Sequence, residues 1–233
     1  MSDRTADPSG SPQRGSLEVT KYAGGPFQQN GYLVRCTRTD RVAVIDPGAV
    51  APTMVQALRD GGWTVEGIYL THGHLDHVEG LEAIREFTDA PIHLHPADLP
   101  LLDRAVDQAA AFGMKFSASL PPPDKEIVPG EALPVGDGEL QVRFAPGHSP
   151  GHVVLYAPAD GFALVGDVIF QGSIGRTDLP GGSLQRLMDS IKSQILTLPD
   201  ETRLLTGHGP ETTVGQERRG NPFLISQFRG EFA

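Results

Sequence analysis

The amino-acid sequence predicts an α/β fold: a sandwich of two packed mixed sheets with helices on the outer faces. Short apolar runs of strand length alternate along the chain with longer segments that carry apolar residues at helical spacing. The strand-like runs fall into two β-rich stretches, and each stretch contains helices of its own. Two sheets that pack together under outer helices account for both observations.

The length and charge of the chain limit its class. Its 233 residues are enough to bury a full core in one domain. Residues 1–16 show no apolar periodicity and predict a flexible tail, so the domain is expected to comprise residues 17–233. The formal net charge of −10 argues against nucleic acid or an anionic membrane as the main partner.

The expected compartment is the cytoplasm. No apolar run reaches the roughly 20 residues that span a bilayer, and no secretion signal is visible at the N-terminus. The single cysteine, Cys36, excludes an intrachain disulfide and fits a reducing compartment. We expect Cys36 itself to be a half-buried strand residue rather than a nucleophile.

The first β-rich stretch opens with two apolar runs, 32–34 and 42–45, which a polar turn at 37–40 joins into a hairpin. Its remaining elements are expected at 52–58 (helix), 65–70 (strand), 78–87 (helix), 91–94 (strand) and 97–112 (helix). Gly61 and Gly62 end the first of these helices.

The second β-rich stretch follows three prolines at 121–123. Strands separated by glycine turns are expected within 127–144, at 153–156, at 162–165 and at 202–206, with a helix at 184–196.

A dense group of potential metal ligands lies at residues 71–80. His72, His74, Asp76 and His77 fall within six positions, although the whole chain contains only eight histidines. The predicted strand before them and helix after them place the group on a connecting loop, where several side chains point at one spot. Neutral imidazole and carboxylate groups suit zinc, iron and manganese. A polar loop that merely contains histidines is the alternative, and the spacing argues against it.

Three later residues repeat one pattern: an apolar strand, a glycine and then a potential ligand. They are His148, Asp167 and His208. A glycine lets the backbone turn sharply, so that the following side chain faces a cleft. Each residue alone reads as an ordinary loop or turn residue, but the repetition favours convergence on one site.

These residues together resemble the pattern of the metallo-β-lactamase-fold hydrolases, H-x-H-x-D-H followed by a distant His, Asp and His. The motifs Thr71–His77 and Pro146–Gly151 resemble the glyoxalase II branch. Gly175–Asp178, Gly207–Thr213 and Asn221-Pro222 resemble its short bacterial members, of the hydroxyacylglutathione hydrolase type. The resemblance implies an αββα sandwich with metals at one edge, between the sheets.

The resemblance also implies a role for each residue. The first metal would be held by His72, His74 and His148, the second by Asp76, His77 and His208, and Asp167 would bridge the two. Two divalent ions, zinc foremost with iron or manganese as alternatives, would share a hydroxide near neutral pH. That hydroxide would attack a thioester of a small-molecule thiol conjugate, such as S-lactoylglutathione or another S-2-hydroxyacylglutathione. Asp76 is expected to take part in catalysis as well as in metal binding.

Three arginines are weaker candidates for contact with a substrate carboxylate: Arg176, Arg218 and Arg219. For the last two, solvent-exposed charges are the alternative. Only 25 residues follow His208, fewer than the helical domain with which longer glyoxalase II enzymes bind glutathione. The identity of the thiol therefore stays open.

Other polar residues are expected to support the site or the core. His152 would orient a ligand through a hydrogen bond, and Asp178 would pair with Arg176 near the cleft. His93 and His95 are expected not to bind metal. Tyr32 and Tyr156 are expected to pack in the strand core.

Three further hypotheses stay open at this stage. A mononuclear non-haem iron persulfide dioxygenase would use His72, His148 and Asp167 as a facial triad. A catalytically silent binding module would not need a full set of ligands. Hydrolysis of lactones or phosphodiesters would use the same metals. The chain is expected to be a monomer or a homodimer.

Overall fold

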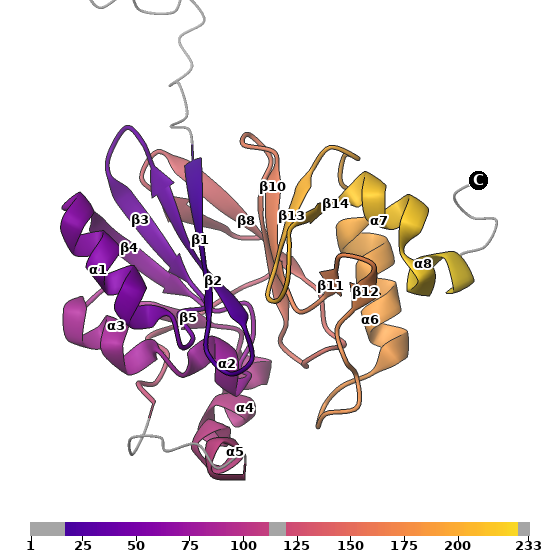
Figure 1. Cartoon of the computed structure of the whole chain (residues 1–233), viewed down its shortest axis with the longest axis horizontal. Coiled ribbons are helices and arrows are strands. Elements are labelled where there is room, and N and C mark those ends of the chain that lie inside the picture. The colour runs from indigo at the N-terminus through magenta and orange to yellow at the C-terminus, as the bar shows by residue number, and fades with distance from the viewer. Residues whose placement is uncertain (1–16, 112–119, 228–233) are drawn as a thin grey trace, which may run out of the picture.

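The computed structural model, which describes residues 17–111 and 120–227, contains two six-stranded sheets that pack face to face (Figure 1). The predicted tail at 1–16 lies outside the described residues. The first sheet has the strand order β1 (Leu17–Gly24), β2 (Gln29–Cys36), β3 (Arg41–Ile45), β4 (Thr64–Tyr69), β5 (Ile92–Leu94), β6 (Lys125–Glu126). Strands β1 to β3 are antiparallel, and β3 to β6 are parallel.

The second sheet has the strand order β14 (Thr212–Thr213), β13 (Arg203–Thr206), β10 (Phe162–Gly166), β9 (Val153–Ala157), β8 (Gly138–Phe144), β7 (Ala132–Val135). Only the β10–β13 pair of this sheet is parallel. A two-stranded ribbon, β11 (Ile169–Phe170) and β12 (Ser173–Ile174), lies beside it. The strands predicted at 153–156, 162–165 and 202–206 are therefore confirmed.

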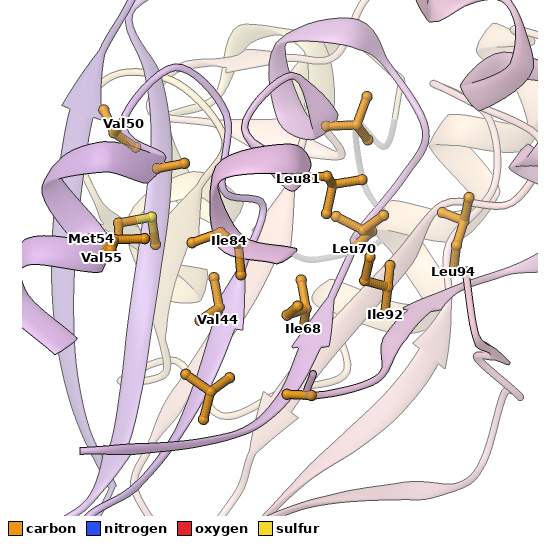
Figure 2. Close-up of a cluster of buried hydrophobic side chains, with 14 of the residues drawn as sticks. Val44, Val50, Met54, Val55, Ile68, Leu70, Leu81, Ile84, Ile92 and Leu94 are labelled. Carbon is orange, nitrogen blue, oxygen red and sulfur yellow. The ribbon is translucent and has the colours of Figure 1, made fainter. Parts of the chain in front are cut away.

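Helices cover the outer face of each sheet, as Figure 1 shows. On the first sheet lie α1 (Ala51–Gly61) and α3 (Leu81–Phe87), and their apolar residues pack onto the strands (Figure 2). On the second lie α6 (Leu184–Ser190), its π-helical continuation η2 (Ile191–Ile195), α7 (Val214–Gly220) and α8 (Pro222–Gln227). None of the described helices is long and apolar enough to cross a membrane.

A third apolar cluster lies between the two sheets. Tyr32, Ile45 and Tyr69 of the first sheet meet Leu155 and Leu164 of the second. The Tyr32 hydroxyl also donates a 2.6 Å hydrogen bond to the Thr206 carbonyl, which joins the sheets. The layers are therefore helix, sheet, sheet and helix, and the predicted α/β sandwich is confirmed. The prediction that Tyr32 and Tyr156 pack in the core is also confirmed, because both are buried.

Two predicted helices have different boundaries in the structure. The helix expected at 78–87 is divided into α2 (Leu75–Val78) and α3. Gly80 lies at the break, where a Cβ would be 1.7 Å from the Pro47 carbonyl oxygen, so the chain turns against a neighbouring loop there. The helix expected at 97–112 consists of η1 (Pro96–Asp98), α4 (Leu99–Asp103) and α5 (Ala105–Ala111), and Phe112 lies outside the described residues.

Candidate metal centre

The first four candidate ligands follow strand β4. His72 and His74 lie in the loop after the strand, whereas Asp76 and His77 belong to the short helix α2. The prediction that all four lie on a loop is therefore wrong for the last two. A helical turn holds the Asp76 and His77 side chains more firmly than a loop would, because its backbone is hydrogen-bonded.

The other three candidates come from the second sheet. His148 follows β8, Asp167 follows β10 directly, and His208 follows β13. Since β8 and β10 both run antiparallel to β9, and β13 is parallel to β10, the three strands end at the same edge. That edge faces the loop after β4, so the structure brings all seven predicted residues together.

The ligand atoms form compact groups. We call His72, His74 and His148 the first triad, and Asp76, His77 and His208 the second triad; within each, one ligand atom per residue lies within 4.8 Å of the others. Across the first triad, His74 Nδ1 lies 2.8 Å from His148 Nε2. Across the second, His208 Nε2 lies 3.1 Å from Asp76 Oδ2. Ligands about 2 Å from a tetrahedral metal lie about 3.3 Å apart, so these separations suit a metal.

Asp167 connects the two triads. Its Oδ2 lies 3.6 Å from His148 Nε2 of the first triad and 3.5 Å from His208 Nε2 of the second. Its Oδ1 lies 3.4 Å from His77 Nε2. This position fits the bridging role that the sequence pattern implies for Asp167.

Buried polar atoms without partners indicate that the site fits a cation. Within the described residues, His72 Nε2, His77 Nε2 and Asp167 Oδ1 are buried and make no hydrogen bond. Leaving such atoms unpaired in a protein interior is costly unless a ligand completes them. Meanwhile the opposite nitrogen of each ring is engaged: His72 Nδ1 lies 3.0 Å from Thr71 Oγ1 and His77 Nδ1 lies 2.9 Å from Asp46 Oδ2. Two of the free atoms, His77 Nε2 and Asp167 Oδ1, lie 3.4 Å apart.

Asp46 is a residue of the site that the sequence did not reveal. Its Oδ2 contacts His77 Nδ1 and accepts a 2.7 Å hydrogen bond from the Thr71 hydroxyl, and its Oδ1 accepts a 2.8 Å hydrogen bond from the Thr71 amide. The carboxylate thereby fixes the ring of His77 and the start of the ligand loop. Asp46 has a left-handed backbone conformation, with φ of 45°, which suits its place in an Asp-Pro-Gly turn. The sequence of the turn did not indicate its contacts with His77 and Thr71.

The two triads differ in the charges that surround their histidines. Burial lowers the pKa of His72 well below its ordinary value and that of His74 to about 3, so these imidazoles are neutral and free to act as ligands. Burial also opposes a charge on His77 and His208, but nearby carboxylates outweigh it and raise the pKa of His208 to about 10. The imidazoles around Asp167 likewise overcome its burial and hold its pKa well below the ordinary range. The second triad therefore lies in the more anionic environment of the two.

A pocket of about 490 Å³ opens onto the centre. Its wall contains the apolar residues Phe27, Leu75, Leu179 and Pro180, together with His74, Asp76, His148, Asp167, Arg176 and His208. Phe27 was not predicted as a site residue; its carbonyl lies 3.0 Å from His208 Nδ1 and orients that ring.

The three predicted arginines differ in location. Arg176 lines the pocket, and its guanidinium forms two 2.8 Å hydrogen bonds with Asp178, so the predicted pair is present. Arg218 and Arg219 lie on α7, away from the pocket lining, and both pair with Asp200. The geometry therefore does not bring these two arginines to the substrate side of the site.

The remaining histidines lie outside both triads. His152 is buried and its Nε2 accepts a 3.0 Å hydrogen bond from the Asp167 backbone amide, so it contacts the backbone of a candidate ligand. His93 packs edge-on against Tyr69, and His95 stacks on Phe144. Neither belongs to the groups of close ligand atoms found in the described residues.

Comparison with known proteins gives consistent matches. The sequence profile of the metallo-beta-lactamase superfamily matches residues 24–208, a range that contains all seven candidate ligands. The probable metallo-hydrolase YqgX of Bacillus subtilis is 39% identical over 86% of this chain and 94% of the relative. The hydroxyacylglutathione hydrolase GloC of Haemophilus influenzae is 36% identical over 86% of this chain and 95% of the relative.

Solved structures extend the comparison. The BLEG-1 B3 metallo-beta-lactamase has a TM-score of 0.82 and 36% identity, covering 89% of this chain and 99% of that one. The protein TTHA1623, solved in a di-iron-bound form, has a TM-score of 0.80 and 41% identity, covering 88% of this chain and all of that one (100%).

Proposed function

The chain belongs to the metallo-beta-lactamase superfamily, and on that premise we propose that it is a metal-dependent hydrolase that cleaves thioesters of a small thiol. The observation that carries the proposal is the composition of the pocket. Five of the seven candidate ligands line it, and none of the residues that line it is a serine, cysteine or lysine. With no serine, cysteine or lysine in the wall, and with its carboxylates and imidazoles assigned to metal, water is the attacking group in this proposal.

The two triads and Asp167 would hold two divalent ions, zinc foremost, with iron or manganese as alternatives. When bound, such a pair supplies hydroxide near neutral pH and stabilises the negative charge that develops on the substrate carbonyl oxygen. The protein contributes fixed ligand positions: Asp46 and the Phe27 carbonyl anchor the rings of His77 and His208, and His152 accepts from the backbone amide of Asp167.

Asp76 has a second role in the proposal. It lines the pocket and its Oδ2 lies 3.1 Å from His208 Nε2. From there the carboxylate would accept the proton released when the attacking water becomes hydroxide, and would return it to the departing thiolate. Oxygen adds to the acyl carbon, the carbon–sulfur bond breaks with its electron pair on sulfur, and the products are a carboxylate and a thiol.

The substrate class is an S-2-hydroxyacyl thiol conjugate, with S-lactoylglutathione the first to test. The named activity of the GloC relative supports a glutathione conjugate. The apolar wall of Phe27, Leu75 and Leu179 suits the uncharged thioester, and Arg176 at the rim suits a carboxylate of the thiol part. Because Asp178 already pairs with Arg176, binding of the thiol part is expected to be weak and the Michaelis constant high.

The test uses one preparation, stripped of metal and reloaded separately with zinc and with ferrous iron. Release of free thiol from S-lactoylglutathione is measured beside hydrolysis of a β-lactam. The proposal expects thiol release and little β-lactam cleavage. No thiol release from any acyl-thiol conjugate under either metal would reject it.

A second candidate is an iron-dependent persulfide dioxygenase. The di-iron form of TTHA1623, at 41% identity, is the observation that favours iron in this site. His72, His148 and Asp167 would then form the facial triad, with the remaining positions open to dioxygen. Oxygen uptake with glutathione persulfide, together with little thioester cleavage, would favour this activity over the hydrolase.

A further inference from the structure

Asp98 is a buried carboxylate outside the seven candidate ligands. It lies at the end of η1, and its side chain is 0% exposed. Within the described residues it forms no ion pair with lysine or arginine. Burial raises its pKa, which reflects the cost of keeping an anion in this position. The cost of burying this carboxylate indicates that its hydrogen bonds have a structural role.

Its hydrogen bonds join two distant segments. Asp98 Oδ2 accepts from the Gly73 amide at 3.0 Å and from the Ser149 hydroxyl at 2.6 Å. Asp98 Oδ1 accepts from the Gly151 amide at 2.5 Å. These partners lie 25, 51 and 53 residues away in the chain.

Both segments carry members of the first triad. Gly73 lies between His72 and His74, and Ser149 follows His148 directly. Glycine at 73 and at 151 allows the approach, because a Cβ there would lie 2.8 Å and 2.9 Å from atoms of Asp98. One carboxylate therefore sets the distance between the two loops that supply the first triad.

The second triad has different supports. Asp46 contacts His77, and the Phe27 carbonyl contacts His208. Neither contact involves Asp98. A change at Asp98 should therefore act on one triad more than on the other.

We propose that Asp98 is a positioning residue that sets the geometry of the first triad, and with it the affinity of that triad for metal relative to the second triad. The inference rests on the metal site of the proposed function, not on the identity of the substrate. Replacing Asp98 with Asn keeps the shape but turns an NH₂ group toward at least one of its three donors, so the two loops lose part of their common acceptor.

The test measures metal binding directly. Protein labelled with ¹⁵N-histidine is titrated in zinc-buffered solutions, and the ring nitrogens of His74 and His148 report on the first triad while those of His208 report on the second. In Asp98→Asn, the free zinc concentration that half-fills the first triad should rise about 10–100-fold, with the second triad little changed. Asp103→Asn, on the exposed side of the adjoining helix α4, is the matched control and should change neither.

Ser149→Ala keeps the carboxylate and removes one of its donors, so it should shift the first triad in the same direction by a smaller factor. It decides the question if Asp98→Asn does not fold. An unchanged ratio between the two triads, or an equal loss from both, would overturn the role of Asp98. A wild-type protein that binds no zinc would reject the metal-dependent function as well.

Discussion

Substituting Gly207 with alanine is expected to displace Asp167 and so to disturb the proposed metal site. A Cβ added at Gly207 would lie 2.0 Å from Asp167 Oδ1 and 2.8 Å from His77 Cε1. The backbone has little freedom to move away, because the Gly207 amide donates to the Gly166 carbonyl at 2.8 Å and the Gly207 carbonyl accepts from the Asn30 amide at 2.7 Å. The Asp167 carboxylate must therefore move instead.

The size of that movement follows from the contact. A Cβ atom in a protein essentially never lies within 3.0 Å of a non-bonded heavy atom, so the Asp167 oxygen must retreat by about 1 Å in Gly207→Ala. A misplacement of about 1 Å at a reacting centre costs on the order of 10²-fold in rate. Because Asp167 lies between both triads, we also expect less than two metals per chain, and a destabilisation of about 1–3 kcal/mol from overpacking.

The assay combines metal content by mass spectrometry, thiol release from S-lactoylglutathione and thermal unfolding. Gly220→Ala is the control: a Cβ at this last residue of α7 meets nothing within 4 Å, so all three measurements should stay near wild type. If Gly207→Ala kept two metals and full turnover, the placement of Asp167 as the shared ligand would be wrong.

Further predictions address the second triad, metal loading and the arginines. Asp76→Ala should lose the second metal and most thioester hydrolysis while the circular dichroism spectrum stays native, because the side chain contacts His208 rather than the core; near-wild-type turnover would contradict a dinuclear mechanism. Chelation should lower the free energy of unfolding by about 4 kcal/mol if the metal was present at about 1,000 times its dissociation constant, and an unchanged unfolding midpoint would argue against a tightly bound metal. Arg218→Ala should leave the Michaelis constant unchanged and cost about 0.5–1.5 kcal/mol of stability, since its bonds go to Asp200 and the Leu196 carbonyl; a raised Michaelis constant would return Arg218 to the substrate site.

The sequence predicted the candidate ligands because their signal is local. His72 to His77 are close in the chain, and His148, Asp167 and His208 each follow a strand and a glycine. Strand ends on one edge of a sheet meet in space, so a repeated local pattern was enough to indicate convergence. The two sheets and their outer helices followed from the same kind of periodicity.

Two supports of the site were not predictable in this way, although His152 was named from the sequence. Asp46 and Asp98 act through hydrogen bonds to residues 25 to 53 positions away, and no spacing pattern in the chain marks such partners. The break between α2 and α3 depends on how closely Gly80 packs against Pro47. The side chains of Arg218 and Arg219 point toward Asp200, and Asp200 comes close to them only when the chain folds.

The ligand groups are shared between the two halves of the sandwich. In the first triad, two members follow a strand of the first sheet and one follows a strand of the second; the second triad has the same division. A metal held by either triad therefore cross-links distant segments: His74 and His148 of the first triad are 74 residues apart, and His77 and His208 of the second are 131 residues apart. During synthesis, neither triad can be complete until the ribosome has released most of the chain. Metal uptake would then report that both sheets have docked, which would make metal retention a direct measure of correct assembly, separate from secondary-structure content.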